Sequence, residues 1–575
     1  MGVERDLAMT ADDGAVLLAD RWAPSGVPGA PLVLLRSPYG RRTLDLVGRL
    51  LAERGYQVVI QSVRGTFGSG GRWEPFRHER ADGAATLRWL AAQPWWPGVV
   101  GTFGPSYLGL TQWALAAAAP DGVQAMALSV TSSAFRHAVV YLGGTFTLET
   151  GATWMNLLEH QEGGWRRALR AQLRSRRGLG PAYTALPLST AEAAILGRTI
   201  EYYQDWLEHE RPGDPWWDEI DFGRDVRRMP PASMVAGWFD IFLPYQLDDY
   251  DALRAAGRPV RLTIGPWTHS SLRLSAAALA DGLDWFDRHL GGRDGGGGAT
   301  TAAGRDGALA ETGVGGASRW QRTARGAARG ARPARQAGVR LRLVGRRRWV
   351  DVAEWPPPAD TVRWHLHGDG GLRRAAPPPA APARYRWDPA HPTPGVGGAS
   401  LNPANAGRRN QRRREERADV RTWTSDPVPA GLVLAGPVAA EIWLRSSNWH
   451  TDLFTRLCTV SPSGRSRNLS DGILRLEPGE EGRVITLGTA ADGEVTGADD
   501  GVVRVRIRMW PIGVELRAGH RLRLQVSGGA HPLVARNLGG GERLGSATRM
   551  VPADHDIFQD PEHPSALLLP HALLA

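Results

Sequence analysis

Four short apolar runs in the first 130 residues alternate with stretches that have the pattern of helices. The runs cover residues 32–35, 57–60, 99–103 and 126–130. Each is apolar at almost every position, which indicates a strand that is buried on both faces. Such strands, separated by helical stretches such as 82–92, form a parallel sheet covered by helices. Residues 1–130 therefore predict the first part of an α/β domain.

The pattern changes after residue 130 and then returns. In residues 131–229 strand signals fade and apolar residues recur at helical spacing, which predicts a helical cap inserted into the α/β domain. Strand patterns return at 233–237 and 260–265, so we expect the second part of the α/β domain to cover residues 230–358.

Two further segments differ in composition from this domain. Residues 291–338 are rich in Gly, Ala and Arg without periodicity, which predicts a flexible, solvated loop that interrupts the α/β domain. From residue 360 to 575 the pattern is all β. Strictly alternating runs such as 503–509, separated by turn residues, predict a β-sandwich or a jelly roll.

A serine lies at one of the predicted strand-to-helix junctions. Ser106 is in the hexapeptide Gly-Pro-Ser-Tyr-Leu-Gly at 104–109, directly after the strand 99–103. Glycines on both sides let such a turn pack closely, and the serine hydroxyl then projects above the end of the sheet. This is the arrangement of a nucleophile elbow, which points to acyl transfer through an acyl-serine.

A serine nucleophile needs a base and an acid that orients the base. In sheet hydrolases the acid and then the histidine follow the serine, each just after a strand. Asp240 follows the strand 233–237, and His269 follows the strand 260–265. We therefore predict a triad of Ser106, Asp240 and His269, and rank it above the alternatives His78, His137, His520 and His531.

The oxyanion that forms on attack needs hydrogen-bond donors that are already in place. The backbone N–H of Tyr107, directly after the nucleophile, is the first candidate. The second is the hydroxyl of Tyr39, which follows the strand 32–35 in a loop stiffened by Pro38.

Composition excludes several classes of protein. The net charge is +10 and the pI is near 10.3, but every basic residue is arginine and much of the excess lies in 291–338. Solvated loops account for this charge, so we expect no nucleic-acid partner. The lone Cys458 excludes an internal disulfide and a multi-cysteine metal site. No apolar stretch reaches the ~18 residues of a membrane span, so we expect a cytoplasmic protein without a membrane partner.

The chain resembles the cocaine-esterase-like hydrolases, which are relatives of the bacterial X-Pro dipeptidyl-peptidases. The resemblance covers nearly the whole chain. Its motifs include Ser-Pro-Tyr at 37–39, Val-Arg-Gly at 63–65, Gly-Ser-Gly-Gly at 68–71, Trp-Glu-Pro-Phe at 73–76, Ser-Tyr-Leu-Gly at 106–109, Gly-Trp-Phe-Asp at 237–240, Gly-Pro-Trp-Thr-His at 265–269, Phe-Asp-Arg-His-Leu at 286–290 and His-Pro-Ser at 563–565.

This resemblance implies an α/β-hydrolase domain, a helical cap and a C-terminal jelly roll. It also implies the triad and the two oxyanion donors predicted above, with no cofactor and no metal. Three features depart from the family pattern, and the long Arg- and Gly-rich insertion at 291–338 is one of them. Ser62 replaces an acidic residue, which puts in doubt a partner for Arg64, and Pro105 precedes the nucleophile.

The residues after Asp240 bear on the substrate, which we expect to be a small-molecule ester, amide or short peptide. Residues 241–244 are apolar, and no carboxylate appears before Asp248. Burying an ammonium against such a run is costly, so we favour a neutral, hydrophobic acyl group. We expect Phe242, Trp154 and Trp165 to line its pocket.

Several alternatives stay open at this stage. They are an X-Pro dipeptidyl-peptidase, an acyltransferase that passes the acyl group to an amine or an alcohol, and a ligand-binding module that uses the jelly roll. A homodimer is also left open.

Overall fold

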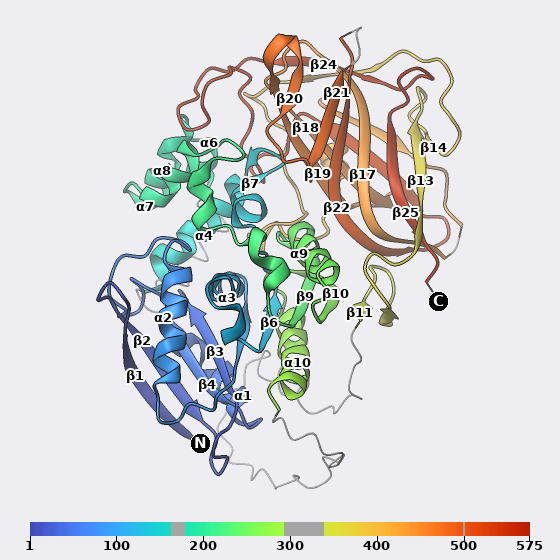
Figure 1. The fold of residues 1–575 in the computed structure, drawn as a ribbon. Helices are drawn as coiled ribbons and strands as arrows, with labels where there is room; N and C mark the ends of the chain where they lie inside the picture. The colour runs from blue at the N-terminus through green and yellow to red at the C-terminus, as the bar shows by residue number, and fades with distance from the viewer. Residues whose placement is uncertain (163–178, 292–337, 430, 498–500, 575) are drawn as a thin grey trace.

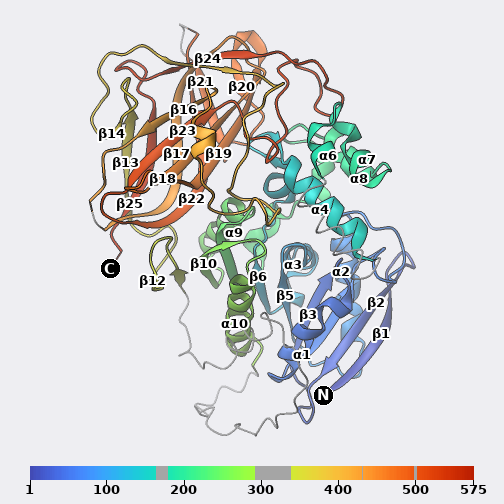
Figure 2. The ribbon, with the colours of Figure 1, turned by 180° about the vertical axis from the view of Figure 1, so that it is seen from behind.

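The structure is a computed structural model. It describes residues 1–162, 179–291, 338–429, 431–497 and 501–574. Figures 1 and 2 show an α/β part that carries the N-terminus, a group of short helices, and a C-terminal part built of strands.

The α/β part is organised around a ten-stranded sheet of order β1-β2-β4-β3-β5-β6-β9-β10-β11-β12. The strands are β1 (Gly2–Thr10), β2 (Val16–Ala23), β3 (Leu32–Ser37), β4 (Gln57–Ser62), β5 (Val100–Pro105), β6 (Ala125–Ser129), β9 (Ala232–Phe239), β10 (Val260–Thr268), β11 (Val339–Leu341) and β12 (Val350–Val352). Neighbours from β4 to β11 run parallel, and the outer pairs are antiparallel. The carboxyl ends of the central strands therefore meet at one edge.

Helices cover both faces of this sheet. They are α1 (Asp45–Ala52), α2 (Glu79–Ala91), α3 (Tyr107–Ala118), α9 (Leu243–Ala255) and α10 (Leu272–His289). Successive residues of β3 point to opposite faces: Leu34 joins a core with Trp113 of α3 and Leu247 of α9, whereas Leu35 joins a core with Leu51 of α1 and Phe286 of α10. The strands are apolar throughout because both of their faces are buried.

Between β6 and β9 the chain forms mostly short helices and turns, which we call the cap. In chain order the described elements are η3 (Arg136–Val140), β7 (Tyr141–Leu142), β8 (Thr145–Phe146), α4 (Leu148–Gln161), α6 (Gly180–Thr184), η4 (Leu188–Thr190), α7 (Ala191–Leu196), α8 (Glu201–Glu208), η5 (Pro215–Glu219) and η6 (Gly223–Arg228). A core rich in aromatic side chains, including Trp154 and Trp206, holds the cap together and extends to Tyr107 of α3.

The C-terminal part contains two antiparallel sheets that share one apolar core. The larger has the order β14-β13-β25-β17-β22-β21, with β24 joining β15 to β17, and the smaller has the order β16-β23-β18-β19-β20. The strands are β13 (Ala359–Leu366), β14 (Leu372–Arg373), β15 (Ala383–Trp387), β16 (Val420–Thr424), β17 (Leu432–Ser446), β18 (Thr451–Val460), β19 (Ser466–Pro478), β20 (Val484–Thr486), β21 (Gly493–Gly497), β22 (Val503–Leu516), β23 (Arg521–Ser527), β24 (Ala553–Phe558) and β25 (Ala566–Ala572).

A buried carboxylate joins the cap to the C-terminal part. Glu149, in the first turn of α4, accepts hydrogen bonds from Ser400 Oγ at 2.5 Å, Asn402 Nδ2 at 3.2 Å and Asn405 Nδ2 at 3.1 Å. Burial raises the pKa of Glu149, and these donors oppose the rise. The donors replace the water that a buried carboxylate loses.

Most of the predicted loop at 291–338 lies outside the described residues, as does Trp165. Among the helices of the described ranges, none is long and apolar enough to cross a membrane.

Candidate functional site

Ser106 lies in a strained turn between β5 and α3. Its backbone has φ 57° and ψ −123°, which is unusual for a residue with a side chain. Its N–H donates to the carbonyl of Ser129 at 3.0 Å, and its carbonyl accepts from the N–H of Gly109 at 2.8 Å. Strain of this kind persists only where the surroundings hold it, and it is typical of nucleophile elbows.

The residues around Ser106 fit this turn. A Cβ on Gly104 would lie 2.4 Å from Leu108 Cβ, and one on Gly109 would lie 2.3 Å from Thr131 Cγ2, so neither position accepts a larger residue without movement. Pro105 is the last residue of β5 and is exposed. A proline at a strand end removes no hydrogen bond from the sheet interior, so this departure from the family pattern is compatible with the turn.

Asp240 and His269 form a hydrogen-bonded pair after the ends of β9 and β10. Asp240 Oδ2 lies 2.6 Å from His269 Nδ1, and Asp240 Oδ1 accepts the backbone N–H of Phe242 at 2.9 Å. The carboxylate is fully buried, whereas the His269 side chain is 15% exposed. The acid is therefore fixed, and it orients the imidazole.

The strands place all three side chains at one edge of the sheet. Ser106 follows β5, Asp240 follows β9 and His269 follows β10, and these strands are parallel. Within the described ranges, no hydrogen bond joins Ser106 Oγ to His269. Contacts of this type commonly tighten only when substrate binds.

Two candidate donors lie next to Ser106. Tyr107 is the first residue of α3, so its N–H has no carbonyl of an earlier helical turn to bind. The Tyr39 hydroxyl interacts with the Ser106 side chain and accepts the indole N–H of Trp154 at 3.4 Å. Burial raises the pKa of the Tyr39 phenol, and those two contacts oppose the rise. The phenol therefore keeps its proton and is a donor.

The side chain of Tyr107 has a separate, structural role. Its hydroxyl donates to Glu79 Oε1 at 2.9 Å and accepts the backbone N–H of Phe76 at 3.3 Å. Burial, and then the charge of Glu79, raise the pKa of Tyr107. Glu79 is itself paired with Arg36 at 2.8 Å. This buried network fixes the start of α3, and the local sequence pattern gave no signal of it.

Aromatic side chains surround the three residues. The Phe242 ring lies 5.7 Å from the His269 ring. Trp154 stacks on Trp206 at 5.9 Å and lies 6.3 Å from Tyr107, measured between ring centroids. Both Phe242 and Trp154 are buried and belong to the aromatic core of the cap. They are close to the site, and their role as pocket walls remains a prediction.

A buried acid on α9 was not predicted from the sequence. Asp249 of α9 accepts hydrogen bonds from Ser133 N–H at 2.9 Å and from Ser133 Oγ at 2.5 Å. Burial raises its pKa to about 7, and the hydrogen bonds from Ser133 oppose the rise. The loop held in this way follows β6 and carries Thr131, which packs against Gly109 of α3.

Arg64 has partners although Ser62 is not acidic. It donates to Asp82 at 2.6 Å and to Asp13 at 2.6 Å. Ser62 Oγ instead accepts from Arg41 at 2.8 Å.

In the part of the chain that the structure describes, no group of three or more His, Cys, Asp or Glu residues could hold a metal ion.

Two family models match the sequence. The X-Pro dipeptidyl-peptidase (S15 family) model matches residues 13–271, and the X-Pro dipeptidyl-peptidase C-terminal non-catalytic domain model matches residues 331–568. The cocaine esterase of Rhodococcus sp. (strain MB1 Bresler) is 29% identical to the chain, with 97% of this chain and 96% of that protein covered. A putative serine esterase of Mycobacterium bovis is 23% identical, with 90% and 89% covered.

Solved structures share the fold over almost the whole length. An α-amino acid ester hydrolase has a TM-score of 0.76 at 20% identity and covers 99% of this chain and 96% of that one. A CocE/NonD family hydrolase of Staphylococcus aureus has a TM-score of 0.64 at 17% identity, with 99% and 94% covered. The predicted α/β-hydrolase fold with a C-terminal β-rich domain is confirmed.

Proposed function

We propose that the chain is a serine hydrolase of the cocaine-esterase-like family and that it cleaves esters or amides with a neutral, hydrophobic acyl group. The observation that carries the proposal is the Asp240–His269 pair at the sheet edge that also holds the strained Ser106 turn. A pair that only stabilised the fold would not need a serine in an unfavourable conformation beside it.

In the proposed reaction His269 takes the proton of Ser106 as the hydroxyl oxygen attacks the acyl carbon. Asp240 holds the imidazole through Nδ1 and stabilises the imidazolium that forms. The Tyr107 N–H and the Tyr39 hydroxyl donate to the oxyanion. His269 then protonates the leaving group. In the second half of the reaction, His269 takes a proton from water as the water attacks the acyl carbon, and it returns a proton to Ser106 as the acid leaves.

The surroundings of Asp240 favour a neutral acyl group. Residues 241–243 are apolar and buried. Asp248, the next carboxylate along the chain, pairs with Arg508 at 2.7 Å and is thereby neutralised. An ammonium buried beside this run would lack a partner in it, which would be costly.

Rates on p-nitrophenyl esters of neutral acids and on an Xaa-Pro p-nitroanilide test the proposal. We expect turnover of the esters, and loss of nearly all of it in Ser106→Ala and His269→Asn. His391→Asn is the matched control, because His391 forms a similar 2.9 Å pair with Asp388 on the surface of the C-terminal part. Turnover of the anilide alone would favour X-Pro peptidase action instead. Acyl products formed with an added amine or alcohol would show acyl transfer.

A further inference from the structure

A tryptophan of the C-terminal part contacts the predicted catalytic acid directly. The indole N–H of Trp510, on β22, donates to the backbone carbonyl of Asp240 at 3.0 Å. Trp510 is 7% exposed and Asp240 is fully buried, so water does not compete for this bond. The same residue that holds His269 through its carboxylate is thus held through its carbonyl by another domain.

A β-bulge brings Trp510 to this place. Gly436 pairs with Ile512 and Val438 pairs with Met509, so β22 has one more residue than β17 between these two pairs. Trp510 and Pro511 of β22 therefore lie opposite the single residue Pro437 of β17. Bulges redirect side chains and are frequent next to active sites, and a proline is tolerated there because the ladder is already interrupted.

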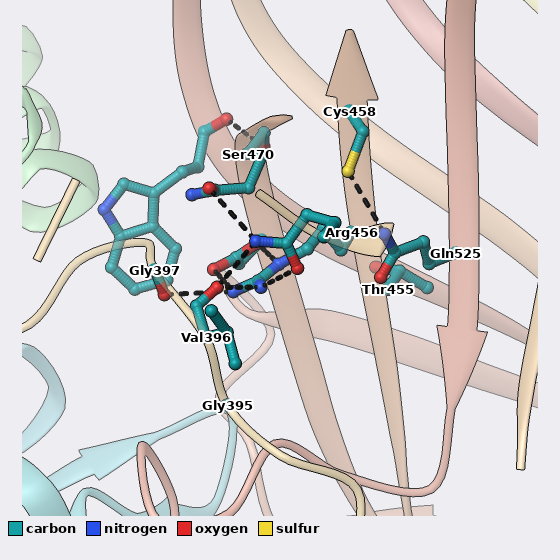
Figure 3. A network of polar contacts seen from close by, with 12 residues as sticks. Gly395, Val396, Gly397, Thr455, Arg456, Cys458, Ser470 and Gln525 are labelled. Atoms are coloured by element: carbon teal, nitrogen blue, oxygen red, sulfur yellow. Dashed lines mark hydrogen bonds and ion pairs between the residues drawn. The ribbon is translucent and has the colours of Figure 1, made fainter. Parts of the chain in front are cut away.

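Buried polar contacts with β19 support the bulge. Ser470 of β19 donates its hydroxyl to the Trp510 carbonyl at 2.6 Å. The neighbouring Asp471 accepts two hydrogen bonds of 2.6 Å from Arg456, whose side chain is fully buried. Figure 3 shows Arg456 directed at the carbonyls of Val396 and Gly397, with Ser470 close by. The backbone that carries Trp510 is therefore rigidly held.

A second contact of β22 fixes the chain just after Asp240. Arg508 donates to the carbonyl of Pro244 at 3.1 Å and pairs with Asp248, both in the first part of α9. The Tyr245 hydroxyl also donates to Asp492 at 2.6 Å, in the turn before β21. The segment that carries the acid is thus anchored to the C-terminal part at several points.

We propose that Trp510 is a positioning residue: its indole N–H fixes the backbone of Asp240 and so sets the angle at which the carboxylate holds His269. This inference rests on the proposed function, because it requires Asp240 to be the catalytic acid. A small displacement of a catalytic group lowers the rate strongly, even when its cause lies far from the reacting atoms. The proposed contact acts on the backbone of Asp240 and not on the substrate, so kcat should change more than KM.

Trp510→Phe tests the inference, because it removes the N–H and keeps an aromatic ring. We expect kcat on a p-nitrophenyl ester to fall about tenfold with KM within about twofold, as for the loss of one buried hydrogen bond that acts on the transition state. The profile of kcat/KM against pH should also move to lower pH, because a displaced carboxylate stabilises the protonated imidazole less.

Trp423→Phe is the matched control. Trp423, on β16 of the C-terminal part, is also buried. Its indole N–H donates at 2.7 Å to the side chain of Gln559, which belongs to the C-terminal part and not to the α/β part. It should lose a similar amount of thermal stability and keep the wild-type kcat and pH profile. An equal fall of kcat in both variants, or a wild-type kcat in folded Trp510→Phe, would overturn the inference.

Two more variants separate the possible failures. Asp240→Asn should lose nearly all activity, and if it remains active the proposed triad fails, and the inference with it. If Asp240→Asn is inactive, only the inference is at stake in the Trp510 experiment. Should Trp510→Phe not fold, Ser470→Ala decides instead: a kcat several-fold lower with KM unchanged supports the inference, and an unchanged kcat refutes it.

Discussion

Replacing Asp249 by Asn should change how stability depends on pH. The carboxylate is buried and accepts two hydrogen bonds from Ser133. An Asn in its place can accept the Ser133 N–H through its oxygen and donate its NH₂ to the Ser133 hydroxyl oxygen. The substitution therefore keeps the shape and both Ser133 contacts, and it removes the titration of the side chain.

The size of the effect follows from the raised pKa. In the folded chain the pKa of Asp249 is about 7, against an ordinary value of 3.8. The folded state therefore keeps this proton to a higher pH than the unfolded state does. The stability that the protonated Asp249 carboxyl contributes is fully present below about pH 4 and is lost as the pH rises through about 7. A difference of about 3 pKa units, at about 1.4 kcal/mol each, gives a loss of about 4 kcal/mol.

Urea unfolding at several values between pH 4 and pH 8, followed by tryptophan fluorescence, measures this. We expect the difference in unfolding free energy between Asp249→Asn and wild type to grow in favour of the variant as pH rises, and to level off above about pH 7. Asp121→Asn, on the exposed turn η2 (Pro120–Gly122), controls for the loss of a negative charge and should follow wild type. A difference that stays constant with pH, or shrinks as pH rises, would refute the reasoning.

Two other substitutions have predictable effects. Tyr39→Phe removes the proposed oxyanion donor next to Ser106, so kcat on an aryl ester should fall about a hundredfold with little change in KM; a wild-type kcat would contradict this role of Tyr39. Glu149→Gln turns an NH₂ toward the donors Ser400 and Asn405, which should cost about 1–3 kcal/mol in unfolding free energy, measured by chemical denaturation; an unchanged value would show that this contact does not stabilise the cap.

The sequence was sufficient to predict the residues whose placement depends on chain order and local pattern. β5 and β9 are mostly apolar, and β10 alternates apolar residues with Arg261 and Thr263. All three strands are mostly buried, so their ends could be located. Parallel strands then bring whatever follows them to one edge, which is why Ser106, Asp240 and His269 could be grouped.

Residues whose role depends on distant contacts could not be predicted. Asp249 lies in an acidic stretch of α9 that has the pattern of a solvated face, although the loop after β6 buries it. Trp510 is 270 residues from Asp240 in sequence, and its direction depends on a bulge that arises only when β22 pairs with β17. Helix ends shifted for the same reason: α2 begins at Glu79 rather than at the expected residue 82, because Glu79 is buried against Arg36.

Labelling with a fluorophosphonate tests the central claim, that Ser106 is an activated nucleophile, most directly. Wild-type protein and Ser106→Ala are treated in parallel, and the adduct is located by peptide mass spectrometry. The account predicts one phosphonyl group per wild-type chain, on the peptide that carries Ser106, and no adduct on Ser106→Ala. Equal labelling of both proteins, or an adduct on another residue of wild type, would contradict it.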